Sequence, residues 1–303
     1  MDAKPRADGE KVGKPRPPIF RALGKRELPS RVEIDGREYA LQRVFKHDSW
    51  AASALYQAGT GRVVCKFNRE QSVLGFPMRW LGRWLAQRET DMLRRLHDVP
   101  LVPDGCGPIY VDGRVVRTAA GHCYVPGGPL GPQHRVSARF FQQLRDLLAT
   151  MHRRGIAYVD LHKQENVLVG EDGQPYLIDF QISLRVPRVW PLGALLNLFA
   201  SSDRYHFAKH LFAHRRDLCS EQDVHLVTRR PWWIRLHRLI AVPVRTARRR
   251  LLVLLGIRHG SGMAQTEHFP EEGFRIAGVP PTRRPRATLP VPAKELTACR
   301  PAA

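Results

Sequence analysis

The stretch from Tyr158 to Phe180, YVDLHKQENVLVGEDGQPYLIDF, constrains the fold more than any other part of the sequence. Its two short apolar runs, NVLVG and PYLIDF, flank the turn sequence EDGQ and predict a pair of short strands. Asp160 and Asn166 precede the first strand, and Asp179 ends the second. Such a pair brings three oxygen-bearing side chains to one side of a site, although each of them taken singly is more often a turn or capping residue.

A long helix is predicted immediately before this stretch. SARFFQQLRDLLATMHRRG carries apolar residues at helical spacing, with Ser137 as a possible N-cap and Gly155 just beyond the C-terminus. The helix therefore leads directly into the segment that contains Asp160.

The chain before this helix predicts strands, one helix and more strands. RVEIDGREYALQRVF alternates with Asp35-Gly36 as a turn, and RVVCKF follows the turn Gly59-Thr60-Gly61 as a further strand. MRWLGRWLAQRETDMLRRLHDV has helical spacing, and the strand-like pieces GPIYVDGRVVRTAA and HCYVPGG come after it. The expected fold class is α+β.

Composition narrows the partners and the compartment. The 49 Lys and Arg residues exceed the 28 Asp and Glu residues, and the net charge of +21 favours nucleic acid, anionic lipid or phosphorylated substrates. The five cysteines form no C-x-x-C pair, so we expect neither a disulfide framework nor a structural zinc site. The sequence shows no signal peptide and no apolar run of the ~18 residues that a membrane span needs. We expect a cytoplasmic protein, soluble or peripheral at the inner face of the membrane.

The three polar residues of the first stretch suit phosphoryl transfer. This reaction needs a metal ion between the phosphates, an acceptor for the proton of the substrate hydroxyl, and a cation on the phosphates. Carboxylate and amide oxygens are hard ligands of the kind that magnesium prefers.

The order of these residues resembles the protein-kinase-like superfamily, and within it the bacterial lipopolysaccharide kinases that phosphorylate Kdo or heptose sugars of the lipid A core. The resemblance runs from about Tyr39 to about Ser183. In such folds the catalytic base is the Asp of H-R-D-L-x-x-x-N, and a metal ligand is the Asp of D-F-G. The resemblance implies that Asp160 is the base and that Asn166 and Asp179 hold Mg²⁺.

The resemblance extends to the residues that bind ATP. It implies that Lys66 in VVCKF contacts the α and β phosphates and that Glu89 in AQRETDMLRRL orients Lys66. CYVPGG stands where such folds have the hinge that contacts adenine, which implies Tyr124 and Val125 as nucleotide-binding residues. Lys163 is a further candidate catalytic residue, because it could neutralise the transferred phosphate.

The sequence also departs from the family pattern. Asp160 follows Tyr-Val instead of His-Arg, and it stands one residue farther from Asn166 than in the family, with His162 and Lys163 as the candidates to fill the gap. Gln181 replaces the glycine of D-F-G, the phosphate loop FKHDSWAAS contains no glycine, and no A-P-E triplet follows. These departures argue against a regulated protein kinase and keep a pseudokinase scaffold open as an alternative.

The expected organisation is a two-lobed kinase-like fold with the nucleotide between the lobes. Residues 1–30 are predicted to be a flexible basic tail, 31–120 a β-rich N-lobe, 121–273 a mainly helical C-lobe, and 274–303 a Pro-rich flexible tail.

Nine arginines and no Asp or Glu lie between Val224 and Thr266, among tryptophans and aliphatic runs. This pattern suits an interfacial helix on anionic lipid, or equally a helix pair whose apolar face packs inward. A nucleic-acid groove is less favoured, because the arginines accompany aliphatic clusters and not spaced stacking aromatics.

The predicted function is ATP-dependent transfer of the γ-phosphoryl group to a hydroxyl, with a sugar of a membrane glycolipid as the preferred acceptor. Three alternatives stay open: a serine/threonine protein kinase-like enzyme or one acting on a small soluble molecule, a membrane-associated pseudokinase scaffold, and a nucleic-acid-binding protein.

Overall fold

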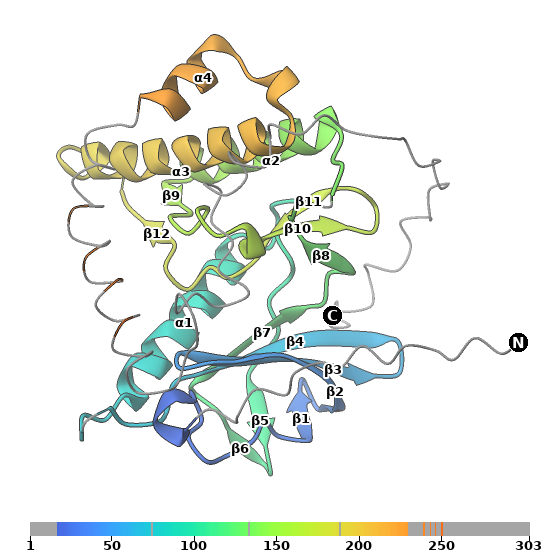
Figure 1. Cartoon of the computed structure of the whole chain (residues 1–303). Helices are drawn as coiled ribbons and strands as arrows, with labels where there is room; N and C mark the ends of the chain where they lie inside the picture. The colour runs from blue at the N-terminus through green and yellow to red at the C-terminus, as the bar shows by residue number, and fades with distance from the viewer. Residues whose placement is uncertain are drawn as a thin grey trace, which may run out of the picture.

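A computed structural model describes residues 17–73, 75–132, 134–187 and 189–229, and the single positions 239, 243, 246 and 250. In this part of the chain the fold is mixed α+β, with a curled antiparallel sheet at one end and helices at the other (Figure 1). The predicted α+β class is confirmed.

The sheet has seven strands in the order β6-β5-β1-β2-β3-β4-β7, and all neighbouring strands are antiparallel. The predicted turn Asp35-Gly36 is present, and both residues have positive φ, as a tight hairpin turn between twisted strands requires. The strands are β1 (Arg31–Ile34), β2 (Arg37–His47), β3 (Ala51–Ala58), β4 (Gly61–Asn68), β5 (Ile109–Val111), β6 (Arg114–Val115) and β7 (Ala119–Cys123).

One hydrophobic core lies on a single face of this sheet. Val63, Cys65 and Phe67 of β4 belong to it, and the residues between them on β4 face the other way because side chains alternate along a strand. This alternation turns Lys66 away from the core of the sheet.

The expected N-terminal tail does not extend to Ser30. The short 3-10 helix η1 (Pro18–Phe20) begins a segment that packs on the sheet: Leu23 and Leu28 are buried in its core, and the Ala22 carbonyl accepts hydrogen bonds from two amides near the end of β4. The apolar residues of this segment stand singly and without periodicity, so the sequence did not predict that they pack on the sheet. Residues 1–16 lie outside the described part of the chain.

Helix α1 (Arg79–Arg95) links the sheet to a second core. At Gly82 the helix lies so close to the sheet that an added Cβ would stand 2.4 Å from the Arg69 carbonyl oxygen. Met92 and Leu93, near its C-terminus, join the second core instead.

The second core is built from helices and short strands (Figure 1). Helix α2 (Ala138–Arg153) is the predicted long helix, and Ser137 caps it by accepting a hydrogen bond from the Phe140 amide at 3.2 Å. The predicted strand pair after it is present as β10 (Val167–Gly170) and β11 (Pro175–Leu177). The remaining elements are β8 (Gly127–Pro129), β9 (Ile156–Ala157), β12 (Leu184–Arg185), α3 (Leu192–His214), α4 (Glu221–Thr228) and the 3-10 helices η2 (Gln164–Asn166) and η3 (Arg216–Leu218).

Several sequence predictions fall beyond this part of the chain. The Arg-rich region from residue 230 onward, apart from four single positions, and the Pro-rich end at 274–303 lie outside the described residues. Among the helices that the structure describes, none is long and apolar enough to cross a membrane.

Candidate active site

Lys66, Glu89 and Asp179 meet between the sheet and the second core. The Lys66 Nζ lies 2.7 Å from the Asp179 Oδ1 and 3.3 Å from the Glu89 Oε2. The side chains of Lys66 and Glu89 are only 12% and 3% exposed. The Glu89 Oε2 is close enough for an ion pair, yet it makes no hydrogen bond of good geometry in the described structure, so the contact is electrostatic.

The three groups set one another's charge. Burial lowers the pKa of Lys66, but Asp179 and Glu89 outweigh burial and raise that pKa above its usual value. Burial raises the pKa of Asp179, but Lys66, assisted by Lys163 and Lys46, brings it below the usual value. Burial and the neighbouring Asp179 raise the pKa of Glu89, which Lys66 offsets only in part. Lys66 and Asp179 are therefore charged at neutral pH.

The loop after β9 fixes one oxygen of Asp160. The carboxylate is fully buried, and its Oδ2 accepts from the Lys163 Nζ at 2.7 Å and from the Asn166 Nδ2 at 2.9 Å. The short helix η2, which ends at Asn166, turns the chain so that Asn166 returns to Asp160. The Oδ1 lies 3.2 Å from the His162 Nδ1, but it is buried and accepts no hydrogen bond of good geometry in the described structure.

Two residues of the site have left-handed backbone conformations. Val159, just before Asp160, has φ +71°, and Asp179 has φ +63°. A β-branched residue seldom adopts positive φ, and such strain persists only where the surroundings hold it. Asp203 of α3 supplies this support, because its carboxylate accepts from the amides of Tyr158 and Val159, each at 2.8 Å.

Tyr158 joins the Asp160 loop to the Asp179 loop. Its hydroxyl donates to the Ile178 carbonyl, and its ring packs edge-on against Phe180 at 5.3 Å between ring centroids. Tyr158 therefore has a defined structural role in joining the two loops.

The expected hinge lies beside β4. Ala120 of β7 pairs with Lys66, and Cys123 pairs with Val63, which places the next residue, Tyr124, about 13 Å along the strand direction from Lys66. The Tyr124 amide already donates to the Arg62 carbonyl at 3.0 Å. Val125 is buried, and its amide has no hydrogen-bond partner within the described residues. Of the two predicted hinge amides, only that of Val125 is left for a ligand.

The predicted phosphate loop is the turn between β2 and β3, and the side chain of Asp48 already binds two backbone amides of this turn. The Asp48 Oδ1 accepts from the amides of Trp50 and Ala51 at 2.7 and 3.0 Å. The other oxygen lies 3.0 Å from the Lys46 Nζ. Burial lowers the pKa of Lys46, but Asp48, followed by Glu165 and Asp179, raises it overall, so Lys46 lies in the field of the site.

Sequence reasoning missed four residues around the site. Asp203 supports the Asp160 loop, and Lys46 lies in the electrostatic field of Asp179. His122 of β7 is half-buried and lies close enough to Lys66 and Asp179 for both charges to affect its pKa, which burial chiefly lowers. Arg88 of α1 donates to the carbonyls of the segment after Asp179. No local pattern in the sequence relates these residues to the site, because their partners there lie far along the chain.

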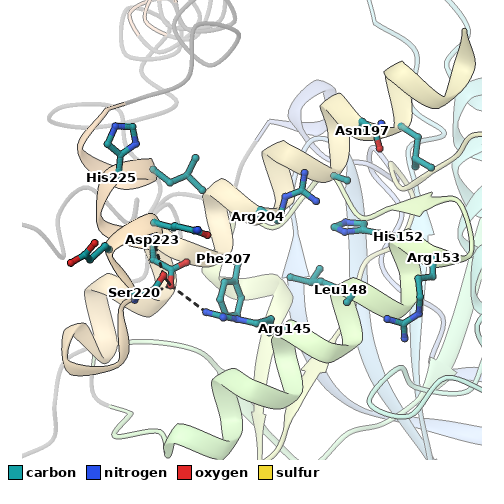
Figure 2. A pocket seen from close by; sticks show the side chains of 16 residues that line it. Arg145, Leu148, His152, Arg153, Asn197, Arg204, Phe207, Ser220, Asp223 and His225 are labelled. Atoms are coloured by element: carbon teal, nitrogen blue, oxygen red, sulfur yellow. Dashed lines mark hydrogen bonds and ion pairs between the residues drawn. The ribbon is translucent and has the colours of Figure 1, made fainter.

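A separate hollow of about 940 Å³ lies between α2, α3 and α4 (Figure 2). None of the predicted site residues lines it. It is connected to the site by one side chain, because His152 lines the hollow and its Nε2 lies 2.9 Å from the Asp203 carboxylate.

The structure thus brings together Lys66, Glu89 and Asp179, places Asp160, Lys163 and Asn166 in a second hydrogen-bonded group, and relates the two groups through the charge of Lys163. Comparison of the sequence with models of protein families and with curated proteins gave no match. The function therefore has to be inferred from the residues of the site.

Proposed function

We propose that the protein is a two-lobed, kinase-like phosphotransferase that moves the γ-phosphoryl group of ATP to a hydroxyl. The sheet with α1 corresponds to the N-lobe, and the second core corresponds to the C-lobe. The observation that carries the proposal is the contact of Lys66 with both Glu89 and Asp179, next to a buried Asp160. Kinase-like catalysis requires a phosphate-binding lysine, its orienting glutamate, a base and a metal-binding aspartate, in this order along the chain.

Asp160 has the geometry of a general base. Lys163 and Asn166 hold its Oδ2, so the carboxylate cannot rotate freely, while the Oδ1 is the oxygen left to accept the proton of an acceptor hydroxyl. Lys163, 2.7 Å from the Oδ2, adds a positive charge beside the point of transfer.

The residues present fit a magnesium site. Asp179 is ionised at neutral pH, and the Asn166 nitrogen is used on Asp160, which leaves the amide oxygen as the atom of Asn166 able to bind a cation. Mg²⁺ takes one or two protein oxygens and completes its shell with phosphate and water, and when bound it neutralises charge on the phosphates.

Two cations are available for the phosphates of ATP. Lys66 is held by Glu89 and Asp179, as expected for α and β phosphate contacts. Lys46 comes from the loop that lacks glycine, and its ammonium can take over part of the role that free backbone amides have in a glycine-rich loop. The Val125 amide is the group available to adenine.

A membrane glycolipid is the preferred acceptor. The segment after Asp179 exposes apolar side chains, among them Ile182, Val189, Leu192 and Leu195, and Trp190 is 90% exposed. Such a surface beside the site suits an acceptor that combines a sugar hydroxyl with an apolar part. The net charge of +21 favours its anionic groups.

A pseudokinase scaffold is the second candidate, and one observation favours it. Asp48 accepts from two amides of the loop that would cover the phosphates, which places a carboxylate where phosphate oxygens would bind. A protein of this kind would bind nucleotide weakly or not at all, and it would not transfer phosphate.

The test is to incubate the full chain and Mg-ATP with a membrane lipid extract and, separately, with a cytosolic extract, and to detect phosphorylated products by mass spectrometry. We expect a phosphorylated lipid that disappears when Asp160→Asn slows transfer by about 10²–10⁴-fold while ATP binding persists. Asp146→Asn, which changes an exposed aspartate of α2, is the matched control and should transfer at the wild-type rate.

Each other outcome decides between the candidates. Phosphate only on cytosolic proteins would replace the glycolipid with a protein acceptor. ATP binding without transfer in either extract would favour the scaffold, and absence of ATP binding would overturn the nucleotide site itself.

A further inference from the structure

A pocket rich in arginine lies beside the start of α1. It has a volume of about 430 Å³ and is formed by the segment before β1, the first turns of α1 and the chain around β6. Five of its lining residues are arginines: Arg26, Arg79, Arg83, Arg114 and Arg117.

Only part of this positive charge is neutralised. Glu70 pairs with Arg26 and lies 4.0 Å from the Arg79 Nε, while the other carboxylate in the lining, Glu27, pairs with Arg21 outside the pocket. The side chains of three exposed arginines, Arg83, Arg114 and Arg117, make no ion pair or hydrogen bond within the described structure. The pocket is therefore suited to an anion.

Large aromatic side chains are exposed next to the pocket. Trp80 and Trp84 are 64% and 50% exposed, and Phe76, just before the helix, is 73% exposed. With about 100° between successive helical residues, Trp80 and Trp84 share one stripe of α1, opposite its buried face, and Arg79 and Arg83 form the adjacent stripe. We call Phe76, Trp80, Trp84 and the five arginines the basic-aromatic surface.

We propose that the basic-aromatic surface docks the protein on a bilayer of anionic phospholipid. Tryptophan is favoured at the level of the lipid headgroups, where its ring is buried and its N–H remains hydrated. Arginine binds phosphate oxygens in a bidentate manner, and anionic headgroups attract basic clusters. In this arrangement Trp80 and Trp84 enter the interface while the pocket holds headgroup phosphates.

Charge and shape favour the bilayer over other occupants. The Arg-rich segment 230–266 contains no Asp or Glu, and a second copy of the chain would present the same arginines, so both would be repelled. The two tryptophans project from the outer side of a helix, whereas single-stranded nucleic acid is held by aromatics along a groove.

The surface is continuous with the candidate active site. The guanidinium of Arg88 lies 4.7 Å from the centroid of the Trp84 ring, and its Nε and Nη2 donate to the carbonyls of Gln181 and Ser183 at 3.1 and 2.5 Å. Docking of this surface would place the bilayer beside the segment that follows Asp179. Vesicle binding itself does not depend on the proposed function, whereas its purpose, access to a membrane acceptor, rests on that function.

Sedimentation with lipid vesicles tests the docking surface in the absence of ATP. The full chain is mixed with vesicles of phosphatidylcholine alone or with added phosphatidylglycerol. We expect binding to the anionic vesicles, and a loss of about tenfold or more in affinity for Trp80→Ala/Trp84→Ala and for Arg83→Glu/Arg117→Glu. Arg135→Glu/Arg139→Glu, with the same change of charge at exposed positions near the start of α2, is the control and should lose less than about twofold.

Wild-type affinity in both sets of surface variants, with folding verified by circular dichroism, would overturn the proposal, as would equal losses in the control. Binding to a single-stranded oligonucleotide, weakened by the same substitutions while vesicles do not bind, would assign the surface to nucleic acid instead. Vesicle binding by a protein that transfers no phosphate would overturn the proposed function and leave the docking surface intact. A variant that no longer binds vesicles but still transfers phosphate to an acceptor in detergent would support both the docking surface and the proposed function.

Discussion

The Lys66 Nζ lies 2.7 Å from the Asp179 Oδ1, although 113 residues separate them in the sequence. Lys66 comes from the sheet and Asp179 follows β11 of the second core. The ion pair can therefore form only when both parts of the molecule are folded and packed against each other.

Replacing Lys66 should destabilise the fold as well as remove phosphate binding. In Lys66→Met the carboxylates of Glu89 and Asp179 lose their cation in a buried setting, and we expect the free energy of unfolding to fall by about 3 kcal/mol. Urea unfolding and calorimetric titration with Mg-ATP measure the two effects.

The double variant Lys66→Met/Glu89→Gln should recover part of the lost stability, because it removes an unpaired carboxylate. The exposed Lys25→Met is the control for loss of a lysine. An unfolding midpoint for Lys66→Met equal to that of the control would show that the pair contributes nothing.

Asp203 should be required for the shape of the Asp160 loop. In Asp203→Ala the amides of Tyr158 and Val159 lose their acceptor, at a cost of about 1–3 kcal/mol for the buried Tyr158 amide and less for the half-buried Val159 amide. Val159 then has no support for its positive φ, and we expect faster hydrogen exchange of both amides together with slower phosphoryl transfer.

His152→Gln provides a matched comparison, since it changes the third partner of Asp203 and leaves both amide hydrogen bonds in place. Slow exchange of the two amides in Asp203→Ala would contradict the supporting role.

Local patterns explain why much of this arrangement was predictable. The turn Gly59-Thr60-Gly61 before RVVCKF identified the strand of Lys66, and helical spacing identified the helix of Glu89. The turn sequence between two apolar runs identified the hairpin that separates Asn166 from Asp179. Each of these signals lies within a few residues of the element that it predicts.

The missed features depend on residues far apart in the sequence. Asp203 lies 44 residues from Val159, and Arg88 lies 93 residues from Gln181, so no local pattern relates them. The tight approach of α1 to Arg69 and the packing of Leu23 on the sheet likewise arise from tertiary contacts.

Gly82→Ala should loosen α1 from the sheet. The new Cβ would meet the Arg69 carbonyl oxygen at 2.4 Å, and relief of this overlap costs about 1–3 kcal/mol, more than the gain of ~1 kcal/mol in helix propensity. Thermal unfolding should show a lower midpoint. Gly128→Ala, where a Cβ meets nothing within 4 Å, should leave the midpoint nearly unchanged, and an equal midpoint for both variants would mean that α1 can shift freely.

The free energy of unfolding should decrease as the pH is lowered, because of a buried histidine. Burial lowers the pKa of His210 from 6.5 to about 4, and its neutral ring is within hydrogen-bonding distance of the Leu161 carbonyl, at 2.6 Å from the Nε2. Between these two values the unfolded chain binds more protons, so stability is lost as the pH decreases, by about 2 kcal/mol at about pH 5.

Urea unfolding at about pH 7 and about pH 5 measures this loss. His210→Gln, whose amide can still donate to Leu161, should reduce the difference between the two conditions, whereas the exposed His97→Gln should not. Part of the dependence should remain, because burial also lowers the pKa of His122 and of His214. An unchanged pH dependence in His210→Gln would assign the effect to other groups.

The long separation between Lys66 and Asp179 in the sequence also affects the order in which the chain folds. Closing so large a loop costs entropy before the ion pair can repay it, so each core can gain structure from shorter loops first. We expect the polar cluster to assemble last during folding. A newly synthesised chain would thus become compact before its site is assembled, and early folding intermediates would be inactive.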